Sequence, residues 1–574
     1  MRTLFAVASL LPTLLAQAAP DPLRFVPSDA VVVVRIAGPA GWQELAATGV
    51  GKAFTACMAS ESGRQLLAMA QKQLDPDGKG EAKGKRLFEA LASHAGDLVL
   101  AGLLDCTVAS ETKPPGFCIA LSIPGDGKTD LAPLQKAIDD SLPAEPQAKT
   151  IEGRELQVHA MAQGELTAPL LVDGSLVMLW ASDLEHFAPR VFAPREVPFA
   201  AVAALRRGVI GVQIEPHQAL TDLGEACGKL DDERGPRAKK ALDLSGVLTL
   251  QRATYSLFAD GAHLGQEARM EWNATPRGIF DIVLPASKRR PALLAFLPPV
   301  TPNWTIGTFD VAAAQALYRQ AFAILGPDIG KSQEEIEGAF TDFTKLLLHE
   351  DFLALIGSEY LRIDDFSALG PDEDVDPQLE KLKDRADAAC YAVQLRDGKK
   401  MAVNFEKAVR ARGLHAGRKT ETYGDVKVHQ LKLLGSLPIE YAFVGDLFVV
   451  GIGDGEGTQR NLRRLLDTVK AQEKQPALPE LAVAVQQRLL GWPEDWAAID
   501  VGGFTELLDG LITMLDSVHQ MLRDADVEPS DIDYLLPATE LSRGLRAELV
   551  RHQADVTVTV WYQSRDAFLM RSRW

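Results

Sequence analysis

One loop of the sequence has the composition of a phosphate-binding loop. Residues 122–130 read SIPGDGKTD and lie between an apolar run and a stretch with helical spacing. A Walker A loop holds phosphate with its backbone N–H groups and needs a glycine five positions before the Gly-Lys pair, where this chain has Ser122. A later Asp-Gly-Lys at 397–399 has no Ser or Thr after the lysine. We therefore interpret both segments as turns.

Two acidic stretches carry part of a calcium ligand set. Residues 75–86, DPDGKGEAKGKR, begin with two well-spaced aspartates, but Lys79 stands at a ligand position and Arg86 replaces the terminal glutamate of an EF-hand loop. The run GPDEDVD at 370–376 would hold a cation only loosely and is more simply a solvated loop. We therefore expect neither a metal site nor a cofactor.

The nucleophiles and histidines form no recognisable catalytic pattern. The chain has ten histidines, and none occurs as H-x-x-H, H-E-x-x-H or H-x-H. No G-x-S-x-G and no C-x-x-C is present. His159 and His429 occupy matching places in two similar stretches, and a shared strand histidine is more often structural than a ligand. We assign no catalytic residue, although a triad assembled from distant residues would escape this search.

Composition and charge limit the classes of function. The chain has 574 residues, which corresponds to roughly two to four domains. Apolar residues make up 47% and charged residues 24%, as in folded proteins. The formal charge of −18 repels phosphate backbones, and no basic run is interleaved with aromatic residues. We therefore expect no nucleic-acid partner.

The first residues have the pattern of a secretory signal peptide. Arg2 precedes the apolar run LFAVASLLPTLL, and Ala16-Gln17-Ala18 provides small residues before APDP. We expect a signal peptide over residues 1–18, cleaved after Ala18 or one residue later, with an uncleaved anchor as the alternative. No later stretch has about 18 consecutive apolar residues, so we expect no membrane span after cleavage. The expected location is periplasmic or extracellular, in a bacterial envelope.

Five cysteines remain after cleavage of such a peptide, and five is an odd number, so at least one is unpaired within the chain. Cys106 and Cys118 flank a Pro-Pro-Gly loop between two strand-like runs. They are candidates for a disulfide across a hairpin, but sequence does not fix the pairing.

The most informative feature is an internal repeat. LLVDGSLVMLWASD at 170–183 is similar to YAFVGDLFVVGIGD at 441–454, which places Gly174 on Gly445. Further matches follow in the same order, and one places Cys118 on Cys390. A repeat of this length is too long for a solenoid and indicates a tandem domain duplication. We expect repeat units at 19–290 and 291–574.

Local patterns predict an α+β fold for each unit. Residues 30–38, AVVVVRIAG, are typical of a buried strand, and Asp173-Gly174 predicts a tight hairpin. Asp130, and Ser182 or Asp183, precede amphipathic stretches as helix caps. Short connections between strands favour antiparallel sheets. We therefore expect two tandem duplicated units, each an antiparallel sheet with helices packed on one face.

The sequence resembles uncharacterised exported bacterial proteins of a domain-of-unknown-function type. The resemblance lies in RFVPSDAVVVVRI at 24–36 and LLVDGSLVMLWASDLE at 170–185. The second repeat departs from it, since FLPPVTPNWTIGTF at 296–309 lacks Ser-Asp-Ala. The resemblance implies export and no assigned activity, and it supplies no functional residues.

These observations favour a non-catalytic exported protein that binds an unknown protein partner or assists envelope assembly. The first alternative is a carrier of a hydrophobic ligand or lipid. The second is a hydrolase whose site is not visible in the sequence.

Overall fold

The structure is a computed structural model that divides into two compact units. Unit 1 comprises the described parts of Met1–Asp243, Val247–Thr275 and Ala547–His552, and unit 2 those of Leu244–Gly246, Pro276–Arg546 and Gln553–Trp574. The structure describes residues 22–574 except 75–95, 106–114, 126–129, 143–144, 162–163, 193–202, 229–233, 274–277, 284–290, 299–302, 330–331, 364–388, 434–436, 453–455, 475–482, 493–495, 525–534 and 564–566.

Several sequence predictions therefore lie outside the described residues. These are the signal peptide at 1–18, the calcium-like stretch at 75–86, Cys106, the Gly-Lys pair of the 122–130 loop and the acidic run at 370–376.

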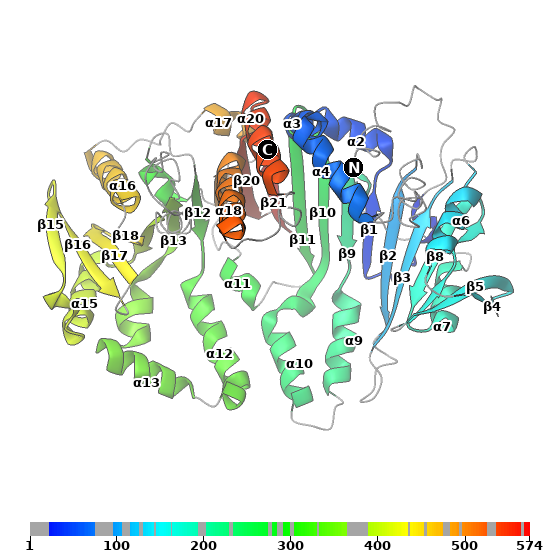
Figure 1. Ribbon diagram of the computed structural model, residues 1–574. Helices are drawn as coiled ribbons and strands as arrows, with labels where there is room; N and C mark the ends of the chain where they lie inside the picture. Colours follow the sequence, from blue (N-terminus) through cyan, green and yellow to red (C-terminus); the bar gives the residue numbers. More distant parts are fainter. Residues whose placement is uncertain are drawn as a thin grey trace. The chain divides into compact units, whose positions relative to one another are not determined.

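Unit 1 is built on an antiparallel sheet. Across it the strands run in the order β11, β10, β9, β1, β2, β3 and β8; β8 then pairs with β6 and β7, β6 with β5, and β5 with β4. Figure 1 shows β1, β2, β3 and β8 side by side. The strands are β1 Val32–Ile36, β2 Leu98–Asp105, β3 Gly116–Ile123, β4 Gln147–Ile151, β5 Arg154–Met161, β6 Gly164–Thr167, β7 Leu170–Val172, β8 Ser175–Ala181, β9 Ile210–Ile214, β10 Leu250–Asp260 and β11 His263–Trp272.

The predicted buried strand is confirmed as β1, which pairs with β2 on one side and β9 on the other. Around the sheet lie η1 Pro22–Phe25, α2 Pro39–Ala46, α3 Gly49–Ala59, α4 Glu61–Leu74, α6 Ala132–Ser141, α7 Leu184–Phe192, α8 Ala203–Arg206, α9 His217–Gly228, α10 Arg234–Ser245 and η3 Val247–Thr249.

Unit 2 has a similar succession of strand pairings, with the single strand β17 where unit 1 has β6 and β7. Its antiparallel order is β21, β20, β19, β12, β13, β14, β18, β17, β16 and β15. The strands are β12 Trp304–Thr308, β13 Ile356–Ile363, β14 Cys390–Leu395, β15 Lys419–Tyr423, β16 Val426–Leu433, β17 Leu437–Val444, β18 Leu447–Ile452, β19 Ala498–Gly503, β20 Val556–Gln563 and β21 Ala567–Arg573.

The helices of unit 2 precede β12 or lie between its strands in the chain. They are α11 Ile279–Val283, η4 Ala292–Phe296, α12 Val311–Ile329, α13 Gln333–Thr344, η5 Leu348–Phe352, η6 Leu353–Leu355, α15 Gly398–Ala411, η7 Leu414–Ala416, α16 Glu456–Lys474, α17 Val483–Leu489, α18 Phe504–Asp524 and α20 Leu535–Arg551. The mixed α+β content and the antiparallel sheet agree with the predicted class.

The prediction that helices cover one face of each sheet is wrong. In unit 2, Val449 of β18 packs in one core cluster with Leu462 and Leu465 of α16, whereas its neighbour Phe448 packs in another with Val409 of α15. Figure 1 shows α15 and α16 on opposite sides of these strands. In unit 1, α6 and α7 likewise belong to separate core clusters, and successive residues of β8 alternate between these two clusters. The sheets are therefore covered on both faces here.

The hairpin predicted at Asp173-Gly174 forms, and the matching stretch around Gly445 forms a hairpin with a different turn. In the β7–β8 hairpin, Asp173 and Gly174 have φ of 48° and 73°, the two positive values of a type I′ turn. In the β17–β18 hairpin, Gly445 has φ of 56° in first position, while Asp446 is not among the positive-φ residues, as in a type II′ turn. The sequence match of Gly174 to Gly445 is therefore shifted by one residue, because Gly174 is the second residue of its turn and Gly445 is the first.

The predicted helix caps are largely confirmed. Asp183 caps α7, because its Oδ1 accepts from the backbone N–H of His186 at 3.1 Å. Asp130 accepts from the N–H of Ala132 at 3.0 Å, although the N-cap position of α6 is Leu131.

The cysteine prediction is decided only in part. The strands β2 and β3, which flank the Cys106–Cys118 loop, do pair as a hairpin. Cys118 is a buried free thiol, and burial raises its pKa to about 12. Cys390, on strand β14, is likewise a buried free thiol. Cys118 is therefore not part of a disulfide, and its candidate partner Cys106 lies outside the described residues.

Among the described residues, no helix has both the length and the apolar character that a bilayer span requires.

The start of α15 is locked against the β17–β18 turn. The N–H of Gly398 donates to Asp446 Oδ1 at 2.9 Å, and a Cβ added at Gly398 would lie 2.0 Å from the carbonyl oxygen of Gly445. A side chain there must displace backbone rather than a flexible neighbour. The turn and the helix can therefore approach this closely only with glycine at position 398.

We expect Gly398→Ala to lower the free energy of unfolding by about 1–3 kcal/mol, because the new methyl group overpacks a backbone contact. The matched control is Gly338→Ala in α13, where a Cβ meets nothing within 4 Å and removing glycine from a helix favours folding. Urea unfolding followed by circular dichroism measures both. Equal effects of the two substitutions would contradict the close contact.

Candidate functional site

The two histidines matched in the sequence lie on corresponding strands, and neighbours hold each in place. His159 of β5 is 2% exposed, and its Nε2 lies 3.5 Å from Asp139 Oδ1 of α6. On β16, His429 Nδ1 lies 2.9 Å from the hydroxyl of Thr420, and its ring centroid is 5.1 Å from that of Tyr441. Burial is the main cause that lowers the pKa of His429. The structural role expected of both histidines stays a prediction.

The Thr420–His429 pair does not amount to a hydrolytic triad. A triad needs a carboxylate bonded to the second ring nitrogen of the histidine. Within the described ranges, the ring of His429 has a hydrogen bond to Thr420 and none to a carboxylate. The described residues also contain no group of three or more His, Cys, Asp or Glu side chains placed to hold a metal.

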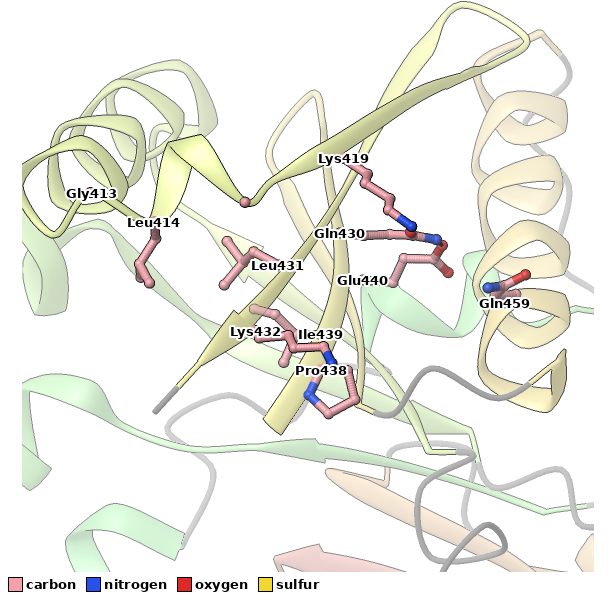
Figure 2. A pocket seen from close by; sticks show the side chains of 11 residues that line it. Gly413, Leu414, Lys419, Gln430, Leu431, Lys432, Pro438, Ile439, Glu440 and Gln459 are labelled. Carbon is pink, nitrogen blue, oxygen red and sulfur yellow. Dashed lines mark hydrogen bonds between the residues drawn. The ribbon is translucent and has the colours of Figure 1, made fainter. Parts of the chain in front are cut away.

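A pocket of about 490 Å³ lies in unit 2, where β16 and β17 meet η7 and α16 (Figure 2). Its size falls within the range of small-molecule sites. Its lining is Gly413, Leu414, Gly417, Lys419, Gln430, Leu431, Lys432, Pro438, Ile439, Glu440 and Gln459. None of these residues is among the candidates named from the sequence.

One wall of the pocket is polar because of strand register. Lys419 pairs with Gln430, and Gln430 pairs with Glu440, so the three side chains form a row across β15, β16 and β17. Ala442, two residues after Glu440 on the same face, packs in the cluster beneath α16. The row therefore lies on the α16 face, and Gln459 of α16 completes this wall.

Glu440 is the chemically unusual member of this wall. Its side chain is only 3% exposed. Its Oε1 accepts a hydrogen bond from Gln430 Nε2 at 2.5 Å, whereas its Oε2 is buried and has no hydrogen-bond partner among the described residues. A buried carboxylate oxygen without a donor is costly, since the water it has lost is not replaced. The hydrogen bond to Glu421 is the main cause that raises the pKa of Arg463 in α16, and the charge of Glu440 adds to it.

The second wall of the pocket is apolar. Leu431 and Ile439 belong to the cluster on the α15 face, and Leu414 of η7 packs against it. The pairing of β15 with β16 ends at Gln430, while β17 pairs with β16 as far as Leu433. The pocket lies where β15 is no longer present, and it therefore reaches both faces of the sheet. The arrangement can therefore bind a molecule with a polar end and an apolar body.

An ion-pair network holds the start of β15 beside the pocket. The guanidinium of Arg418 donates to both carboxylate oxygens of Glu406 in α15, and Arg410 Nε donates to Glu406 Oε1 at 2.7 Å. The hydrogen bond from Arg418 is the largest cause that lowers the pKa of Glu406 to about 2. Arg418 stands between two lining residues, Gly417 and Lys419, so this network positions the pocket's edge.

A sequence signal for Glu440 does exist. The stretch LPIEYAFV at 437–444 is an apolar strand interrupted by one acidic residue. A charge at such a position is a candidate for function when no ion-pair partner is evident. What the sequence cannot give is the register that aligns Lys419, Gln430 and Glu440.

Comparisons with known proteins add little. No family model and no curated protein matches the chain. Among solved structures, crystal forms III and I of TP0453 are similar at 11% identity and a TM-score of 0.22, over 45% and 46% of this chain and 83% of theirs. Crystal form IV of TP0453 is similar at 10% identity and the same TM-score, over 44% of this chain and 81% of that one. At this TM-score the likeness carries no argument about function.

We expect Glu406→Gln to destabilise the protein in a pH-dependent way. Because the folded state holds the pKa of Glu406 near 2, below its ordinary 4.5, its stabilising effect is complete above about pH 4.5 and is lost as the pH falls towards 2. The difference in unfolding free energy between wild type and variant should therefore shrink across that window. Urea unfolding at several pH values from about 6 to about 3 measures it.

The matched control is Glu421→Gln, since Glu421 is 45% exposed and has an ion pair with Arg463 at 2.7 Å. An exposed ion pair of this kind contributes little to the free energy of unfolding. The ion-pair network around Glu406 would be contradicted if the difference in unfolding free energy between wild type and Glu406→Gln stayed constant as the pH falls.

Proposed function

We propose that the chain is an exported, non-catalytic binding protein whose unit 2 pocket holds a small amphipathic ligand. The observation that carries the proposal is Glu440, a pocket-lining residue whose Oε2 is buried without a donor in the part of the chain that the structure describes. A buried ionised group is weak evidence for stability, because an apolar residue of similar volume often serves the fold as well or better. Function therefore accounts for a carboxylate at this place better than folding does.

The mixed lining favours this function over its alternatives. A carrier of a wholly hydrophobic ligand or lipid would bury Lys419, Gln430 and Glu440 against a molecule that offers them no hydrogen bonds. A hydrolase would need a nucleophile, a base and an orienting acid together, and Thr420 with His429 supplies only part of that set. Binding of a protein partner remains part of the proposal, with the pocket as the place where a segment of it docks.

We also infer that units at 19–290 and 291–574 arose by duplication. The common succession of strand pairings supports this, as do the two-residue turns of the β7–β8 and β17–β18 hairpins. Export rests on the sequence of residues 1–18, which predicts a periplasmic or extracellular location.

We expect the chain purified from an exporting host to carry a bound small molecule. Native mass spectrometry should give a mass above that of the polypeptide, and the excess should disappear on denaturation. Gly417→Trp should abolish the excess, because Gly417 lines the pocket and a Cβ there meets nothing within 4 Å, so the indole takes up pocket volume.

The matched control is Glu334→Trp, on the exposed surface of α13, which should retain the excess mass. A bare polypeptide mass for the wild-type chain, or an excess that survives Gly417→Trp, would contradict the proposed pocket.

A further inference from the structure

We infer that the ligand of this pocket is a short peptide with a free amino terminus and apolar side chains. The inference rests on the proposed binding function of the same pocket and names its ligand class. Three features of unit 2 carry it: the unpaired carboxylate oxygen of Glu440, the two lysines in the lining, and the open edge of β16.

The unpaired oxygen selects a cationic donor. An ionised carboxylate only accepts hydrogen bonds. Gln430 donates to one oxygen of Glu440, whereas Oε2 is buried without a donor among the described residues. At 3% exposure, water reaches this carboxylate poorly. A charge-assisted hydrogen bond from an ammonium group compensates both the missing donor and the buried charge, and a neutral donor compensates only the first.

The two lysines select a second, negative group on the same ligand. Lys419 and Lys432 both line the pocket, and Lys419 belongs to the row that includes Glu440. A ligand with positive charge alone would be attracted by Glu440 but repelled by the two lysine ammonium groups. A molecule with an ammonium and a carboxylate at separate positions matches all three charges.

The open edge of β16 favours an extended peptide over a free amino acid. Beyond Gln430, β16 is paired with β17 but no longer with β15, and the pocket lies along this part of the strand at Leu431 and Lys432. A peptide backbone laid against such an edge gains main-chain hydrogen bonds. Its apolar side chains would contact Leu414, Leu431 and Ile439 on the other wall.

Isothermal titration calorimetry of the full chain, after extensive dialysis, tests the inference with Leu-Leu, Val-Val and Phe-Phe dipeptides. Free leucine is the comparison for backbone length, and N-acetyl-Leu-Leu lacks the ammonium group. We expect at least one dipeptide to bind, free leucine to bind more weakly, and acetylation to weaken binding roughly tenfold to a hundredfold.

The variant Glu440→Gln keeps the shape of the side chain and removes its charge. We expect it to weaken dipeptide binding to a similar degree, with acetylation causing little further loss in that variant, because both changes remove the same interaction. Glu334→Gln, on the exposed surface of α13, is the control with the same change in charge and should bind as the wild type does. Circular dichroism checks that each variant is folded.

The outcomes separate this inference from the proposed function. If none of the three dipeptides binds while the purified chain still carries a ligand that Gly417→Trp removes, the peptide inference is wrong and the binding function stands. If acetylation or Glu440→Gln leaves dipeptide binding unchanged, the role given to Glu440 is wrong. If neither dipeptides nor a co-purifying molecule bind, both proposals are overturned.

Discussion

Helices bury both faces of the unit 2 sheet, and this burial is what makes a carboxylate on one of its strands unusual. Helices α15 and α16 cover opposite faces of β17 and β18, so alternate side chains of each strand enter one core or the other. Leu462, Leu465 and Leu466 of α16 are fully buried, and each contributes about 2 kcal/mol. A strand in this setting has no solvated side, so a carboxylate on it must find a partner inside the protein or from a ligand.

The pocket follows from the way this sheet ends. β15 stops pairing at the row that contains Gln430, and the exposed end of β16 brings the two faces into one cavity. Arg418 and Glu406 fix the chain immediately before that row, which keeps β15 from sliding along β16. The free edge, and the meeting of the polar and apolar walls in one cavity, thus both result from one strand ending early.

Much of the local structure was predictable from sequence. The β-branched run of β1, the two-residue hairpins and the cap at Asp183 depend on neighbouring residues alone. Coverage of both faces was missed, although continuous apolar runs such as SLVMLWA of β8 and LFVVGI of β18 indicate strands buried on both sides. The pocket could not be predicted, because it depends on the register of three strands and on where α16 lies above them.

The most direct test of the central claim is a crystal structure of the chain purified from an exporting host. We expect an ordered molecule in the unit 2 pocket, with a donor atom within hydrogen-bond distance of Glu440 Oε2. A pocket without such a molecule, in which the ammonium of Lys419 closes onto Glu440 instead, would contradict it. The carboxylate would then be satisfied within the protein, and the case for a ligand would be lost.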